Sequence, residues 1–218
     1  MNKLTKQLKS MLLIMLCVIL IGPSMNVSAA TQRQKAMAAY KKVLSGSRVY
    51  VVPNNQYIMD FFHFRRDYHG SLPKNVYFGL AYIDGDSIPE LVMQAKCNGI
   101  TIYSVWTYKN GKAYRAYYNR GTRQLRGYFQ KTGMFKEKGI SGDYSYAETY
   151  YKLSGTTSKF MLDKWVFTNG NETDYWIGTR TCTAKAYAAK LKSLTKGLKM
   201  KKISFVKNTG TNRKAKLK

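Results

Sequence analysis

Residues 101–118 read TIYSVWTYKNGKAYRAYY, and this stretch decides the expected fold. Aromatic and β-branched residues fill 101–108 and 113–118, and Asn110-Gly111 lies at the centre of the connection between them. Asn and Gly both tolerate the positive φ that a two-residue turn needs, so this pattern is the strongest local signal for a β-hairpin. We therefore expect two antiparallel strands here.

Three more strands are expected on the C-terminal side of this hairpin. They cover residues 146–153, 159–167 and 173–178, and turns that contain Gly155 and Gly170 separate them. Strands at this spacing, without long helices between them, favour an antiparallel sheet.

Helices are expected at both ends of the sheet, because residues 31–44 and 184–195 carry apolar side chains at helical spacing. Residues 199–207 (KMKKISFVK) are expected to form a basic strand. The Gly-containing stretches 121–127 and 139–142 are expected to be connections, since Gly weakens strands. The predicted fold is α+β and β-rich: an antiparallel sheet or partial propeller-like meander flanked by N- and C-terminal helices.

The composition indicates a strongly basic globular protein. The chain has 218 residues, 37 Lys and Arg, 11 Asp and Glu, and a formal net charge of +26. Its 44% hydrophobic and 14% aromatic residues are too many for a disordered polycation. Two His are too few for a three-His zinc site, and three Cys exclude a Cys-rich metal fold.

The first thirty residues have the layout of a secretory signal peptide. Three lysines precede an apolar run at residues 11–21, which is too short to span a bilayer, and small residues follow it. We expect cleavage after Ala29 or Ala30, which would leave residues 31–218 as a single basic domain without a transmembrane segment.

Export also determines how the cysteines are interpreted. Cys17 would leave with the signal peptide, so the secreted chain would hold Cys97 and Cys182. In an oxidising compartment two cysteines predict one disulfide, although two unpaired buried thiols are the alternative.

One acidic motif stands out in this basic chain. Residues 82–91 read YIDGDSIPEL, which places Asp84, Asp86 and Glu90 around a turn. Closely spaced carboxylates on such a turn are what a Ca²⁺ site supplies. The alternative is a turn without metal, in which the Asp side chains accept hydrogen bonds from backbone N–H groups.

This motif resembles the D-x-D-G-D-G-x-x-E-L loop of FG-GAP/VCBS-type repeats. More broadly, residues 80–93, 103–112 and 208–214 resemble motifs of uncharacterised secreted proteins of Gram-positive, Clostridia-like bacteria. The resemblance implies an exported protein. No cofactor is predicted, and Ca²⁺ at this loop is the possibility left open. Tyr82 replaces the first Asp of such loops and Ser87 replaces a Gly, which weakens the implied metal site.

No catalytic residues are predicted. His63 lies in an aromatic run and is expected to be packed, and neither it nor His69 accompanies a G-x-S-x-G nucleophile motif. Asp143 and Glu148 could serve a glycosidase only if they faced one cleft, which the sequence does not show. No phosphate-binding loop of the Walker type occurs.

Charge is the strongest functional signal. Residues 185–218 hold 12 basic residues and no acidic residue. Such a field attracts polyanions by steering and counterion release. The contact residues expected from this segment are Lys199, Lys201, Lys202, Lys207, Arg213, Lys214, Lys216 and Lys218. A second basic and aromatic surface is expected from Tyr114, Tyr117, Tyr118 and Tyr128 with Arg115, Arg120, Arg123 and Arg126.

These observations predict a secreted, extracellular protein, associated with the cell wall and without catalytic activity. Its expected partners are anionic wall polymers or lipid headgroups that hold it by charge, and physiological nucleic acid is not among them. Two alternatives stay open: an envelope hydrolase with an unlocated Asp/Glu site, and a purely structural secreted domain.

Overall fold

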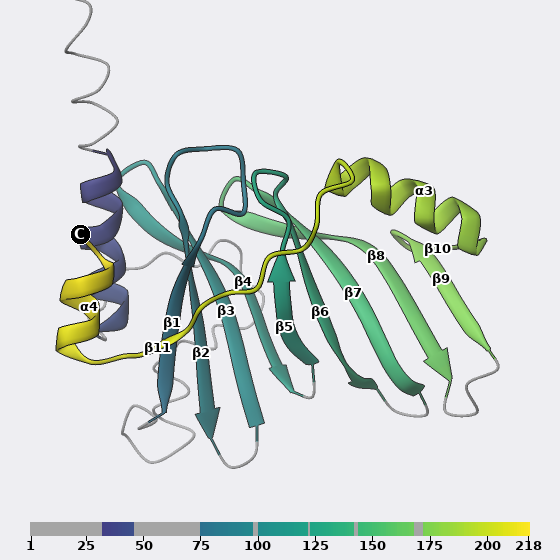
Figure 1. Ribbon diagram of the computed structural model, residues 1–218, viewed down its shortest axis with the longest axis horizontal. Coiled ribbons are helices and arrows are strands. Elements are labelled where there is room, and N and C mark those ends of the chain that lie inside the picture. The colour runs from purple at the N-terminus through teal and green to yellow at the C-terminus, as the bar shows by residue number, and fades with distance from the viewer. Residues whose placement is uncertain (1–31, 46–74, 98–99, 122, 142–143, 168–171) are drawn as a thin grey trace, which may run out of the picture.

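The computed structural model describes residues 32–45, 75–97, 100–121, 123–141, 144–167 and 172–218. The signal peptide, His63, His69 and Asp143 lie outside these ranges, so the predictions about them are not addressed by the structure. The described residues form two antiparallel sheets with helices at both ends of the chain (Figure 1). The predicted β-rich α+β class is confirmed.

Sheet A has five strands in the order β11-β1-β2-β3-β4. The predicted hairpin joins β3 to β4, with Lys109 opposite Lys112 and positive φ at Asn110 (49°) and Gly111 (79°). Positive φ at both central residues is what the Asn-Gly pair permits. The strands are β1 (Val76–Ala81), β2 (Glu90–Cys97), β3 (Ile100–Lys109), β4 (Lys112–Gly121) and β11 (Val206–Lys207).

Sheet B has six strands in the order β10-β9-β8-β7-β6-β5, a meander in which each strand pairs with the next. The expectation that residues 121–127 and 139–142 are connections is wrong, because most of them lie in β5 and β6. The strands are β5 (Arg123–Tyr128), β6 (Met134–Ser141), β7 (Tyr144–Ser154), β8 (Thr157–Phe167), β9 (Thr173–Ile177) and β10 (Arg180–Cys182).

Three apolar clusters hold these layers together. The N-terminal helix (residues 32–44) buries Met37 and Tyr40 against one face of sheet A, next to Trp106. The opposite face of sheet A packs on sheet B, where the ring of Tyr117 lies 4.9 Å from that of Phe135. The third cluster lies between sheet B and helix α3.

Helix α3 (Ala184–Thr195) has the bounds that the sequence predicts. Thr183 caps its N-terminus by accepting a hydrogen bond from the backbone N–H of Ala186, and Lys196 ends it in the left-handed conformation. Tyr187 packs against Tyr175 of β9 with ring centroids 5.1 Å apart. Helix α3 therefore covers one face of sheet B, which we call the front face (Figure 1).

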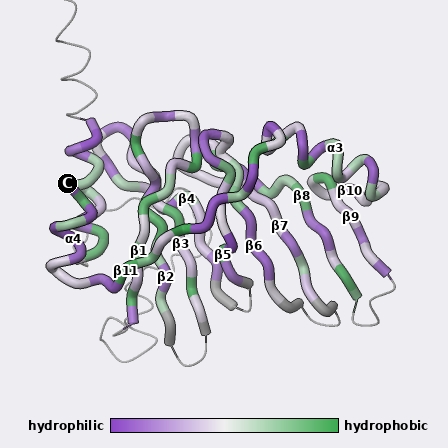
Figure 2. Tube along the Cα trace, in the orientation of Figure 1, coloured by the Kyte–Doolittle hydropathy of each residue, from purple (hydrophilic) through white to green (hydrophobic). Residues whose placement is uncertain are grey.

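After α3 the chain crosses the molecule as an extended segment, residues 198–209, which we call the strap (Figure 1). The predicted strand over 199–207 is wrong in extent, since only β11 at its end pairs continuously. The strap passes from sheet B to sheet A, and no single neighbour runs beside it for long enough to form a longer ladder. Hydrophilic and hydrophobic stretches alternate along it (Figure 2). Helix α4 (Gly210–Lys216) follows.

The expected disulfide is not present. Cys182 is a free thiol at the end of β10, within the cluster beneath α3, whereas Cys97 ends β2 in the other sheet. A disulfide requires the two Cα atoms to lie within about 7 Å of each other. In the part of the chain described, no helix has the length and apolar character needed to cross a membrane.

Candidate functional site

The strap is held to both sheets by backbone contacts. Tyr128 of β5 and Lys201 exchange two hydrogen bonds of 2.9 and 2.8 Å, and Val206 and Lys207 pair with β1. Gly127 and Gly79 make this approach possible. A Cβ at Gly127 would lie 2.3 Å from the carbonyl oxygen of Lys201, and one at Gly79 would lie 2.6 Å from that of Ser204. The basic segment is thus part of the folded domain rather than a free tail.

The strap and α4 expose most of the lysines predicted to contact polyanions. The amine of Lys201 donates a hydrogen bond to Gln130, and so lies against the turn before β6. Arg213 has a different role, because its guanidinium donates to Asn208 (2.8 Å) and to the carbonyl of Leu44 (3.4 Å). It holds α4 to the end of the N-terminal helix. The exposed members are Lys199, Lys201, Lys202, Lys207, Lys214, Lys216 and Lys218.

Lysines of sheet B continue this charge on the front face. Gly127, which the strap crosses, pairs with Lys136 of β6, and paired residues point to the same face of a sheet. Lys136 and Lys138 lie 2.8 and 3.8 Å from the two carboxylate oxygens of Glu148. Lys164 pairs with Glu148 from the other side. The Glu148 carboxylate therefore lies between two amines of β6, with Lys164 on the neighbouring strand.

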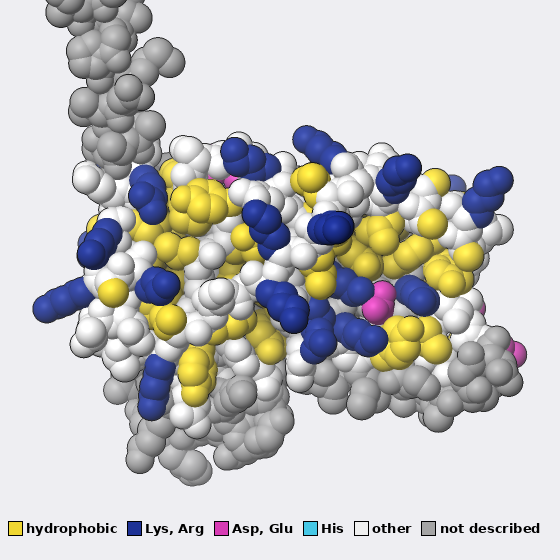
Figure 3. All heavy atoms as spheres, in the orientation of Figure 1, with side chains coloured by type: hydrophobic (Ala, Val, Ile, Leu, Met, Phe, Trp, Pro, Cys, Tyr) yellow, Lys and Arg dark blue, Asp and Glu magenta, His cyan; other side chains and the backbone are white. Residues whose placement is uncertain are grey.

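Aromatic rings lie under these amines. The Lys138 amine is 3.8 Å from the centroid of the Tyr146 ring, and the Lys164 amine is about equally far from Tyr146 and Tyr175, at 5.9 and 6.0 Å. Contacts of this kind restrain lysine side chains without neutralising them. We use the name basic face for Arg126, Lys136, Lys138, Lys164, Lys199, Lys201 and Lys202. Figure 3 shows Lys and Arg side chains gathered on this side of the molecule.

The sheet B part of the basic face was not among the residues predicted from the sequence. The signal that could have found it is the alternation Lys136-Glu137-Lys138, which puts both lysines on one face of a strand and buries Glu137 on the other.

The second expected basic and aromatic surface does not form as a surface. Tyr117, Tyr128 and Arg115 are buried, and the Arg115 guanidinium lies 5.0 Å above the Tyr118 ring. Arg126 is exposed and donates to Gln124. The side chains of Arg120 and Arg123 lie outside the described part of the structure.

The acidic loop has the shape that both of its interpretations predicted. Asp84 accepts a hydrogen bond from the N–H of Asp86 (3.0 Å), and Asp86 accepts one from the N–H of Ile88 (2.7 Å). Glu90, at the start of β2, accepts one from the N–H of Ile83 (2.8 Å). One oxygen from each of the three carboxylates lies within 4.8 Å of the others. The hydrogen-bonded turn is confirmed, and calcium stays a prediction.

Burial raises the pKa of two carboxyl groups in this cluster. The Glu90 side chain is 1% exposed, and this burial, together with the charges of Asp84 and Asp86, raises its pKa to about 8. Desolvation raises the pKa of Asp84 in the same way. Three carboxylates this close are stable together only if a proton or a cation reduces their repulsion. The raised pKa favours a protonated Glu90 at neutral pH.

The back face of sheet B carries a depression that the sequence analysis did not identify. It offers about 400 Å³ and is lined by side chains of β8 and β9 and by the turn after β9. The segments Asp163-Lys164-Trp165 and Asp174-Tyr175-Trp176 share the spacing D-x-W and pair antiparallel. Its lining residues are Phe160, Asp163, Trp165, Asp174, Trp176, Gly178 and Thr179.

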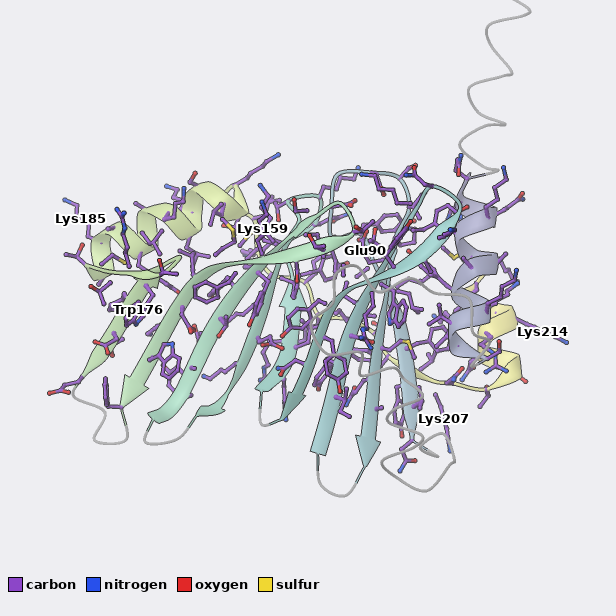
Figure 4. All side chains as sticks on the ribbon, turned by 180° about the vertical axis from the view of Figure 1, so that it is seen from behind. Glu90, Lys159, Trp176, Lys185, Lys207 and Lys214 are labelled. Carbon is purple, nitrogen blue, oxygen red and sulfur yellow. The ribbon has the colours of Figure 1, made fainter. Side chains whose placement is uncertain are left out.

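The register places each Asp of this depression opposite the Trp of the other strand. Asp163 pairs with Trp176 and Trp165 pairs with Asp174, so the two carboxylates are diagonal neighbours. Diagonal neighbours in an antiparallel sheet lie about 7–8 Å apart. Figure 4 shows Trp176 on the outer strands of sheet B and Glu90 near the middle of the molecule. Asp163 and Asp174 are thus two carboxylates that line one depression.

The structure does not test a pairing of Asp143 with Glu148. Glu148 lies on the front face and is engaged by two lysines, and Asp143 is outside the described residues.

Comparison with known proteins found no relative of this chain. No protein-family model, curated protein or solved structure matches the chain significantly. The likeness to clostridial secreted proteins accordingly rests on its short motifs.

Proposed function

We propose that this protein is a secreted, non-catalytic binding protein of the cell envelope that is retained by anionic wall polymers at its basic face. The observation that carries the proposal is the strap, which places lysines of the C-terminal segment beside the lysines of sheet B. Export rests on the signal-peptide layout of residues 1–30.

Fixed lysines suit this function better than a flexible basic tail would. Hydrogen bonds to Tyr128 hold the backbone of the strap at Lys201, and Lys136 projects from the face that the strap crosses. Less conformational entropy is lost on binding when the charges are already placed. A linear phosphodiester polymer, with a charge in every repeat, can contact several of these amines at once.

The protein's net charge supports the same partner class. After loss of residues 1–30, which hold three lysines and no acidic residue, the formal charge of +23 raises the local concentration of polyanions and speeds their association. The negative charge of Glu148 offsets part of the positive charge of the basic face. Glu148 is already paired with Lys136 and Lys138, and the other lysines of the face keep their full charge.

The test is a salt series of binding to soluble poly(glycerol phosphate), a polymer without sugar or lipid. The logarithm of the binding constant should fall linearly with the logarithm of salt concentration, with a slope of about −0.7 for each phosphate contact. A variant with Lys138→Gln, Lys199→Gln and Lys202→Gln should bind more weakly and lower the magnitude of the slope by about 2.

The matched control has the same loss of charge outside the basic face. Lys35, Lys41 and Lys42 are exposed on the N-terminal helix, and their replacement by Gln should leave most of the slope in place. Equal effects of the two triple variants would mean that net charge alone drives binding, and would refute the assignment to the basic face.

A further inference from the structure

The depression on the back face of sheet B presents two kinds of ligand-binding group in a regular pattern. Two indole rings and two carboxylates occupy the corners of a cross-strand checkerboard, with Asp163 opposite Trp176 and Trp165 opposite Asp174. Both Trp side chains are half-buried, and Phe160 at the edge is 39% exposed. Large aromatic side chains at the surface of a depression commonly mark a binding site.

The volume and the position of this depression suit a small rigid group. About 400 Å³ falls within the range of small-molecule sites. The depression lies on β8 and β9, on the face of sheet B opposite to α3 and the lysines around Glu148. A ligand here would leave the basic face free.

The pattern of groups selects an uncharged ligand rich in hydroxyls. Carboxylates accept strong hydrogen bonds from hydroxyl groups, and indole faces carry a negative quadrupole that attracts C–H groups. A pyranose ring offers both: hydroxyls at its edge and C–H groups on its face. A cationic ligand would also suit Asp and Trp. However, the formal charge of +23 on residues 31–218 opposes its approach, whereas a neutral ring is unaffected.

We infer that the Asp163–Trp165–Asp174–Trp176 depression binds a neutral pyranose unit of a glycan. The indoles pack against the faces of the sugar ring, and the Asp174 carboxylate accepts hydrogen bonds from its hydroxyls. This binding is independent of the charge-driven contact at the basic face.

The two carboxylates differ in their accessibility to a ligand. Asp163 is only 5% exposed, and the hydroxyl of Thr149 donates a 2.8 Å hydrogen bond to its Oδ1. Asp174 is half-buried and is therefore the carboxylate that a bound ring can reach.

The experiment is calorimetric titration of the full protein with cellohexaose, chitohexaose and maltohexaose, which are neutral and differ in linkage and substituents. At least one should bind at millimolar or lower concentration. Asp174→Asn, which keeps the shape of the side chain, and Trp176→Ala should each weaken that binding about tenfold. If Trp176→Ala unfolds, Asp174→Asn alone decides the outcome.

The two proposals fail separately in this experiment. The variant with Lys138→Gln, Lys199→Gln and Lys202→Gln should bind the sugar unchanged, and Asp174→Asn should bind poly(glycerol phosphate) no more weakly than the unmodified protein does. No heat from any of the three hexasaccharides overturns the glycan site. Binding of tetralysine in place of the sugars, lost in Asp174→Asn, overturns it in favour of a cation site.

Discussion

Replacing Gly127 by Ala should destabilise the protein, although the same change in an ordinary strand would stabilise it. No positive φ is present at Gly127, so Ala can adopt its backbone conformation. Relieving the entropic cost of Gly in a strand would on its own contribute about 0.5–1 kcal/mol of stability. The strap reverses this sign, because it occupies the space that the new methyl group needs.

The magnitude follows from the contacts at this position. The added Cβ would lie 2.3 Å from the Lys201 carbonyl oxygen and 2.9 Å from Cγ of Met200. The first neighbour is backbone, so the strap itself must move. Overpacking costs about 1–3 kcal/mol. Loss of the two hydrogen bonds between Tyr128 and Lys201 adds about 1 kcal/mol each. We expect a net loss of about 2–4 kcal/mol after the gain from Ala is subtracted.

Urea denaturation, followed by circular dichroism, measures this change directly. Gly85→Ala is the matched control, since a Cβ there meets nothing within 4 Å, and its free energy of unfolding should change by less than about 0.5 kcal/mol. The Gly127→Ala variant should also lose affinity for poly(glycerol phosphate), because the lysines of the strap move with the backbone. A Gly127→Ala protein as stable as the unmodified one, or more stable, would refute the placement of the strap over β5.

Three further predictions concern the acidic loop and the free cysteine. In chelator, stability should fall by on the order of 3 kcal/mol as pH rises from about 5 to 8, because folding raises the pKa of Glu90 to about 8 and so favours its protonated form. Glu90→Gln should flatten this dependence in pH-resolved urea titrations, and an unchanged slope would contradict the origin proposed for it. Millimolar Ca²⁺ should raise Tm relative to chelator, and less so in Asp84→Asn, because a ligand that binds only the folded state stabilises it; equal melting curves would assign the loop to its hydrogen-bonded turn alone. Cys182 should react with iodoacetamide without prior reduction, and a mass that changes only after reduction would show that it is oxidised.

Local signals in the sequence predict local structure well here. The hairpin at Asn110-Gly111 depends on two residues that tolerate positive φ, and its geometry is as expected. Helix α3 depends on its own periodicity and on neighbours within a turn, such as the cap at Thr183. In both cases the residues that determine the element lie within it.

Errors arise where distant segments determine the outcome. Gly127 indicates a connection when only its neighbours are considered, yet it lies in strand β5. The strand has a Gly at this position because a segment about seventy residues later passes close to it. The strap makes only short β-pairings, because it contacts the edge strands of two different sheets, β5 of sheet B and β1 of sheet A. Cys97 and Cys182 could not be assigned to different sheets without the strand order.

For the candidate site too, the sequence shows which residues are present but not how distant segments bring them together. Net charge and the clustered lysines of the C-terminus are visible in the composition, but their junction with Lys136 and Lys138 depends on how the strap crosses β5. The two D-x-W segments are visible in the sequence as well. Their checkerboard requires the register of β8 against β9, which no local pattern determines.

The most direct test of envelope retention is a pull-down of the protein on purified Gram-positive cell walls, with and without teichoic acid, across a salt series. Binding should need the teichoic acid and fall steeply as salt rises. Glutamines at Lys138, Lys199 and Lys202 should weaken it more than glutamines at Lys35, Lys41 and Lys42. Binding that is indifferent to teichoic acid and to salt would contradict this prediction, and would show that the basic face does not hold the protein to the wall.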